Sequence, residues 1–106
     1  MSQEKAPSFF HSLKQRHPDF IDAVDRLGQA VREQGPLDNK TAHLVQLAAA
    51  AAIRSEGAVH SHVRRALEAG ASVEEARHTL MLLTSTIGFP TVVAALSWIE
   101  DVLGQE

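Results

Sequence analysis

The side chains best suited to chemistry in this sequence are histidines, because the chain has six of them and no cysteine. Imidazole titrates near neutral pH and can both give and take a proton, so His62 is a candidate general acid or base. The alternative for His62 is a structural histidine bonded to a backbone carbonyl. On a continuous helix Ser55, Ala58 and His62 lie within about 60° of one another. Ser55 would be a nucleophile only beside a base and an oxyanion hole, and nothing in the sequence supplies such a hole. We expect it to be a helix-end or turn serine that lies near a bound ligand.

Arginines close to this face could attract an acidic ligand. Guanidinium groups bind carboxylates well, and Arg54, Arg64 and Arg65 lie near Ser55 and His62 in the sequence. The alternative is that each arginine pairs with a glutamate of the same stretch or with a neighbouring subunit. We predict that Arg54 and Ser55 contact a substrate.

A metal site built from histidines is the less favoured interpretation. Zinc prefers three or four protein ligands, and His43 with His62 would supply two. His60 is a conceivable third, but about 200° on a helix separates it from His62, so the two rings cannot point the same way unless the helix is irregular. We therefore predict no metal and no cofactor.

Glycine and proline divide the chain into stretches that each have a helical pattern. Short loops between them favour antiparallel neighbours. Phe20, Val24, Leu27 and Val31 recur at helical spacing and form one apolar stripe. The predicted helices cover residues 7–16, 18–34, 39 to a break near Gly57, from that break to Ala69, 72–87, and 90 to the end. Asp38 and Ser72 are predicted N-caps, and Ser72 with Glu75 forms a predicted capping box.

The helix that starts near Asn39 contains an unusual run of five alanines, residues 48–52. Alanine has high helix propensity and little bulk, so a neighbouring helix can approach closely. We place this helix at the centre of the bundle, with Leu44, Leu47, Ala48 and Ala51 as its apolar stripe.

Three stretches of the sequence resemble the carboxymuconolactone decarboxylase family. They are LDNKTAHLV from Leu37, HVRRALEAGASVEE from His62, and IGFP from Ile87. The resemblance implies an all-α fold of the alkylhydroperoxidase D type, about six helices with a central antiparallel helical hairpin, and homo-oligomers, often trimers or hexamers. It divides the chain into an N-terminal helical segment, residues 1–36, and a family-like domain, residues 37–106, which together form one globular domain.

The sequence also departs from the family's redox branch. That branch carries two cysteines, the second of them four residues before a histidine that looks like His62, and the cysteines would fall on Ser55 and Ala58. A glutamate of that branch falls on the position of His43. The decarboxylase branch also lacks these cysteines and keeps a histidine that looks like His62. The resemblance therefore implies His62 and His43 as catalytic residues.

A meeting of these two histidines is not assured by a simple hairpin. His43 precedes Ser55 by 12 residues, about 18 Å of helix, whereas His62 follows it by seven, about 10 Å. We predict that the two rings nevertheless approach each other and line the main pocket, with Ser55 nearby. Their meeting requires either a tilt between the two arms or a ligand or water between the rings.

Composition and charge limit the kinds of molecule that the chain is expected to bind. The net charge is -3 and the basic residues are scattered, which argues against nucleic acid. The longest apolar run, residues 47–53, is too short to span a membrane, and residues 1–6 lack the pattern of a signal peptide, so we expect a cytoplasmic protein. Residues 81–83 and 91–96 are apolar beyond what a small core needs, which predicts a homo-oligomer.

Two functions fit these observations. The first is acid/base chemistry, of a decarboxylase or isomerase type, on a small acidic or lactone metabolite through His62 and His43. The alternative is a non-catalytic oligomer that binds a small ligand or a metal. A thiol-dependent peroxidase is excluded because the chain has no cysteine.

Overall fold

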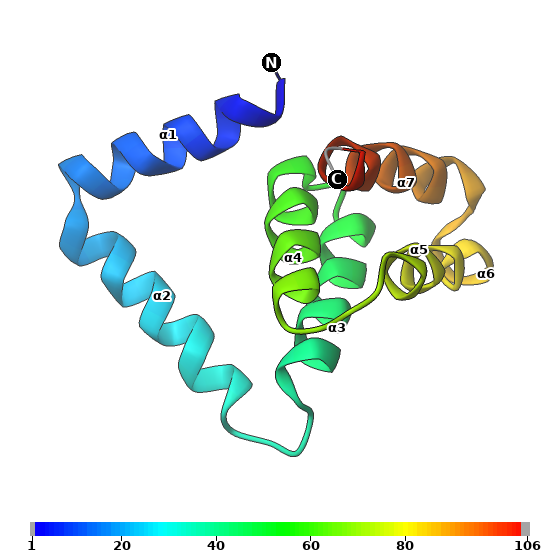
Figure 1. Cartoon of the computed structure of the whole chain (residues 1–106), viewed down its shortest axis with the longest axis horizontal. Helices are drawn as coiled ribbons and strands as arrows, with labels where there is room; N and C mark the ends of the chain where they lie inside the picture. Colours follow the sequence, from blue (N-terminus) through cyan, green and yellow to red (C-terminus); the bar gives the residue numbers. More distant parts are fainter. Residues whose placement is uncertain (1, 105–106) are drawn as a thin grey trace. The chain divides into compact units, whose positions relative to one another are not determined.

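The structure is a computed structural model that describes the backbone of residues 2–104 and the side chains of residues 9–104. Every regular element in this part of the chain is helical, which confirms the predicted fold class (Figure 1). Six helices have nine residues or more, and one is a single turn. In chain order they are α1 (Ser2–Arg16), α2 (Pro18–Arg32), α3 (Asn39–Ala52), α4 (Glu56–Glu68), α5 (Val73–Met81), α6 (Thr84–Ile87) and α7 (Phe89–Leu103).

The chain divides into two compact units, Met1–Leu37 and Asp38–Glu106. The first holds α1 and α2. Helix α1 begins at Ser2 and not at Pro7, as the sequence had indicated. The earlier start was not predicted because the polar residues before Pro7 show no apolar periodicity. Helix α2 begins at Pro18 as predicted. Its apolar stripe is regular but exposed: Phe20, Val24, Leu27 and Val31 are each 49% to 64% accessible to solvent.

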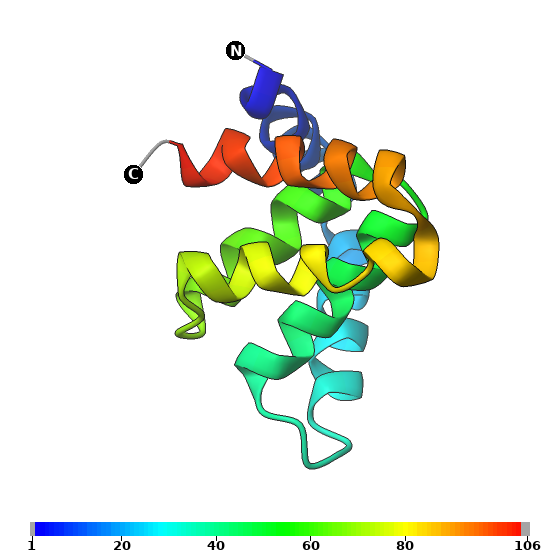
Figure 2. The same cartoon turned by 90° about the vertical axis from the view of Figure 1, so that its right-hand side faces the viewer.

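The second unit is built around the hairpin of α3 and α4. Asp38 caps α3, because its carboxylate accepts a hydrogen bond of 2.8 Å from the backbone N–H of Thr41. Hydrogen bonding from Thr41, first from its side chain and then from this backbone N–H, lowers the pKa of Asp38. Figure 2 shows α7 lying across the end of the hairpin where α3 turns into α4, while α5 runs beside the helices lower down.

The turn between α3 and α4 comes earlier than the sequence indicated. A break was expected near Gly57, but Gly57 lies in the first turn of α4. The chain reverses at Arg54, whose φ of 57° is in the left-handed region. The N–H groups of Arg54 and Ser55 bond the carbonyls of Ala51 and Ala50, each at 3.0 Å, which is the Schellman arrangement. An arginine occupies the position that usually holds glycine, so residue type alone did not reveal the turn.

Helix α4 ends in the same arrangement with the usual residue. Gly70 has φ 104°, and the N–H groups of Gly70 and Ala71 bond the carbonyls of Leu67 and Ala66. The predicted capping box then opens α5: the Ser72 hydroxyl accepts from the Glu75 N–H, and the Glu75 carboxylate accepts from the Ser72 N–H, both at 2.9 Å. The bond from Ser72 and an ion pair of 3.2 Å with Lys40 lower the pKa of Glu75.

The single helix predicted over residues 72–87 is two segments, α5 and α6. At the junction the Leu83 N–H bonds the carbonyl of Leu80, three residues back instead of four. The Thr84 hydroxyl donates to the carbonyl of Met81 at 2.8 Å. Such a side-chain bond competes with the helical pattern, which accounts for the break. Gly88, at φ 96°, then leads into α7.

Helices α3, α4, α5 and α7 supply the core of this unit. Five of its side chains are completely inaccessible to solvent, namely Leu47, Val59, Val63, Leu80 and Ile99. The buried face of α3 comprises His43, Leu47, Ala50 and Ala51, so the expected stripe through Leu44 and Ala48 was only partly right. An alanine run has no period of its own, and tertiary packing selects which side turns inward.

Among the described residues no helix is both long and apolar enough to cross a membrane.

Candidate functional site

Helix α4 carries two histidines that face different helices. His60 and His62 are two residues apart, which is about 200° around a helix. The His62 ring approaches His43 of α3, whereas the His60 ring contacts Asp101 of α7. The geometric argument that separated the two histidines therefore holds in the structure.

The rings of His43 and His62 come close together. Their centroids are 5.7 Å apart and their planes are inclined by 36°. His43 is 6% exposed because it belongs to the buried face of α3. His62 is half-buried on α4. The predicted approach of these two rings across the hairpin is observed.

The early turn explains how they meet. His43 lies nine residues before the end of α3 at Ala52, and His62 lies six residues after the start of α4 at Glu56. The axial offset is therefore three residues (9 minus 6), about 4.5 Å, instead of the five residues (12 minus 7) that a turn centred on Ser55 gives. An offset of this size allows contact between the rings without a bridging molecule.

Two imidazoles at this distance influence each other's charge. Two imidazolium charges 5.7 Å apart repel by about 3 kcal/mol at an effective dielectric constant of 20. A proton on one ring thus opposes a second proton on the other. Such coupling disfavours the doubly charged pair, and an imidazole is chemically able to act as a general acid or base.

Ser55 occupies the N-cap of α4. Its backbone is extended, with φ -96° and ψ 96°, and its side chain makes no capping hydrogen bond. It is half-buried. Ser55 is therefore a helix-end serine. This was expected because the sequence supplies no oxyanion hole that a nucleophilic serine would need. Its hydroxyl is not committed to the helix that it caps.

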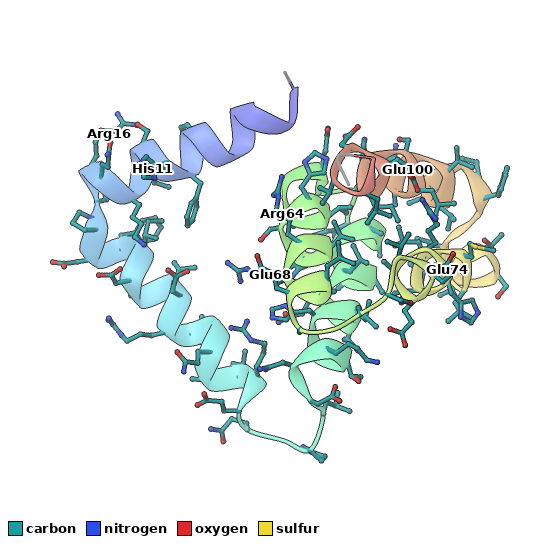
Figure 3. The ribbon with its side chains drawn as sticks, in the orientation of Figure 1. His11, Arg16, Arg64, Glu68, Glu74 and Glu100 are labelled. Carbon is teal, nitrogen blue, oxygen red and sulfur yellow. The ribbon has the colours of Figure 1, made fainter. Side chains whose placement is uncertain are left out.

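Arg54 contacts the last helix of the chain. The exposed Arg54 donates a hydrogen bond of 3.0 Å from Nη1 to the Thr91 hydroxyl, in the first turn of α7. This contact joins the turn of the hairpin to α7, so it directs the guanidinium to that helix. Figure 3 shows Arg64 projecting from the same side of α4 as Glu68, one helical turn away. The predicted role of Arg54 in substrate binding stays a prediction.

The other face of α4 brings together residues that the sequence did not connect. His60 is 3% exposed, and its Nε2 lies 3.0 Å from Asp101 Oδ2 and 3.9 Å from Glu56 Oε2. The spacing of Glu56 and His60, four residues on one helix, is visible in the sequence. Asp101 is 41 residues away from His60, and only the packing of α4 against α7 places it there.

The sequence profile of the carboxymuconolactone decarboxylase family matches residues 18–101. The chain belongs to this family. The match includes α2, and so it begins within the segment that the motifs alone had set apart. The sequence contains no cysteine, so the chain is a cysteine-free member of the family. Ser55 and Ala58 stand at the positions where the resemblance to the redox branch would place cysteines.

The chain is also similar to individual proteins over most of its length. The chain is 31% identical to an uncharacterized protein of Methanocaldococcus jannaschii over 94 residues, 89% of this chain and 88% of the relative. A second uncharacterized protein of that organism is 28% identical over 91 residues, 85% of this chain and 88% of the relative. The crystal structure of a carboxymuconolactone decarboxylase family protein from Legionella pneumophila, in its apo form, is 24% identical. The two structures superpose with a TM-score of 0.76, and the match covers 93% of this chain and 91% of the Legionella chain. The two chains therefore have the same fold.

Proposed function

We propose that this family member performs acid/base chemistry, of a decarboxylase or isomerase type, on a small acidic or lactone metabolite. The observation that carries the proposal is the 5.7 Å separation of the His43 and His62 rings, with His43 almost completely buried. Imidazole is the side chain whose ordinary pKa lies nearest to neutral pH. Two such rings in contact form a unit that can accept a proton and return it.

Each reaction type makes a definite demand on the pair. In an isomerisation, one neutral imidazole removes a proton from carbon beside a carbonyl group, and the resulting imidazolium returns it at another carbon. In a decarboxylation, the electrons of the breaking C–C bond stay on the substrate while CO₂ leaves, and an imidazolium protonates that carbon. His62 transfers the proton in both cases, and His43 modulates its charge or exchanges the proton with it.

Ser55 and Arg54 complete the proposed site. Ser55 has a hydroxyl free of capping at the start of α4, where the helix dipole favours an anion. Arg54 is adjacent and exposed, and it would exchange its bond to Thr91 for a substrate carboxylate. This assignment supports an acidic or lactone substrate rather than a basic one.

Homo-oligomerisation is part of the proposal, with a trimer or hexamer favoured by family resemblance. Large apolar side chains of the second unit are exposed, among them Met81 at 56%, Leu82 at 61% and Phe89 at 63%. Exposed apolar side chains that gather into a patch are typical of an interface, and we propose that these residues contribute to one. Light scattering of the purified chain should return a multiple of 11.5 kDa, and a single 11.5 kDa species would contradict this part of the proposal.

The function is tested with a panel of small carboxylic acids and lactones. Ligands are detected by the increase in melting temperature, and turnover by deuterium incorporation from D₂O or by release of CO₂. The His62→Asn variant should lose turnover by about 100-fold or more, the usual range for a general acid or base. His78→Asn is the matched control, because His78 is exposed on α5. Turnover that survives His62→Asn would contradict the proposal, and binding without turnover would favour the non-catalytic alternative.

A further inference from the structure

A second cluster of ligating side chains lies on the α7 side of α4. The Nε2 atom of His60, one carboxylate oxygen of Glu56 and one of Asp101 all lie within 4.8 Å of one another. Glu56 and His60 are one turn apart on α4, and Asp101 belongs to the last turn of α7. The cluster is therefore held by two helices that pack in the core, and it does not depend on a loop.

The three groups of this cluster do not balance one another's charge. Two carboxylates converge on a single ring nitrogen. A proton on that nitrogen serves the Asp101 oxygen at 3.0 Å, while the Glu56 oxygen at 3.9 Å is beyond hydrogen-bond distance. With a neutral imidazole the net charge of the three groups is -2, and protonation leaves -1. A divalent cation would bring it to zero and use all three oxygen and nitrogen donors at once.

The distances also suit a small cation. Zinc binds imidazole nitrogen and carboxylate oxygen at about 2.1 Å, which places tetrahedral ligands about 3.4 Å apart. The observed 3.0 and 3.9 Å lie on either side of this value. His60 is 3% exposed and fixed, whereas the side chains of Glu56 and Asp101 are 50% and 35% exposed, so the carboxylates have room to close on an ion. Three protein ligands would leave a fourth position for water.

We propose that Glu56, His60 and Asp101 form a binding site for one divalent transition-metal ion, with Zn²⁺ as the best match to one imidazole and two carboxylates. The site lies on the opposite face of α4 from the His43–His62 pair, so it is independent of the proposed reaction. A bound ion would join the first turns of α4 to the last turn of α7 and stabilise the folded chain.

The experiment uses the full-length, tag-free chain after removal of metal with a chelator. ZnCl₂ is titrated calorimetrically, and Co²⁺ is used as a spectroscopic probe because its visible absorption reports tetrahedral coordination. We expect one ion per chain and a rise in melting temperature with Zn²⁺. Glu56→Gln and Asp101→Asn should each weaken binding by at least about tenfold, since even the loss of an outer-shell partner has an effect of that order.

Two controls make the outcome decisive. Glu68→Gln makes the same charge change on an exposed residue of the same helix and should bind as the original chain does. His62→Asn tests the other face. The proposal is overturned if the chain takes up neither ion, if Glu56→Gln binds as well as Glu68→Gln, or if His62→Asn removes binding that both carboxylate variants keep. Because Glu56 is half exposed, its variant provides the test even if Asp101→Asn fails to fold.

Discussion

His60 and His62 stand two residues apart on α4 but have opposite surroundings. His60 is buried against α7 and faces two carboxylates, Asp101 at 3.0 Å and Glu56 at 3.9 Å. His62 is half-buried against α3 and faces the ring of another imidazole, that of His43. The same residue type thus meets anions on one face of the helix and a group of its own kind on the other.

The difference separates two uses of histidine. A carboxylate next to an imidazole fixes the orientation of the ring and thereby the nitrogen that it presents to a metal ion. A second imidazole opposes a second proton and leaves the pair free to exchange one. We therefore expect the α7 face of α4 to contribute stability and ion binding, and the α3 face to contribute proton transfer. The following predictions test this division, beginning with the largest effect.

The first prediction concerns the free energy of unfolding of the chain without metal. His60→Ala should lower it by about 2 kcal/mol, because the change leaves a void at a buried position and removes the hydrogen bond with Asp101. His78→Ala, at an exposed position, should change it by less than about 0.5 kcal/mol. Urea denaturation followed by circular dichroism measures both. Equal stability of the two variants would show that the α7 face does not hold the fold together.

The second prediction concerns the turn that sets how α4 is rotated, and therefore which helix each histidine faces. Arg54→Ala should destabilise the chain by about 1 kcal/mol, because alanine keeps the left-handed strain and loses the bond to Thr91. Arg54→Gly loses the same bond but relieves about 1 kcal/mol of strain, so it should be close to neutral. Thermal unfolding of the two variants side by side measures the difference. If glycine is no better than alanine, the conformation of Arg54 is not a source of strain.

The third and smallest prediction concerns the neighbour of Asp101 on α7. Glu100 pairs with Arg77 of α5 through bonds of 2.8 and 3.0 Å, and this pairing holds the pKa of Glu100 below its ordinary 4.5. The pair should stabilise the fold above that value and lose its effect as the pH falls through the lowered pKa. Because both side chains are partly exposed, Glu100→Gln should cost less than about 1 kcal/mol at neutral pH and nothing in strong acid. Unfolding curves at both pH values test this, and a difference that persists in acid would assign another role to Glu100.

Local signals accounted for most of what the sequence predicted correctly. The caps at Asp38 and Ser72 and the end of α4 at Gly70 involve residues within a few positions of each other, so their types reveal them. The family resemblance supplied His43 and His62, and the structure brings their rings together. Their proposed roles, with those of Ser55 and Arg54, remain predictions.

What the sequence missed depends on contacts between distant residues or on unusual residue choices. The approach of Asp101 to His60 exists only once α7 packs on α4, and no spacing rule reaches across 41 residues. The turn at Arg54 was missed because glycine, not arginine, is the usual sign of a left-handed residue. The break between α5 and α6 was missed because apolar periodicity continues across it while the hydrogen bonding does not.

The alanine-rich arm of the hairpin has a consequence for how such a pair of histidines can change over evolutionary time. Ala50 and Ala51 are buried on the same face of α3 as His43, and helices that meet through small side chains approach within about 8 Å. We expect the gap between the two imidazoles to depend on these small residues as well as on the histidines themselves. A descendant with valine or leucine at one of these alanines would keep both histidines and hold them farther apart, so that the spacing of the pair could drift while its residue types stay the same.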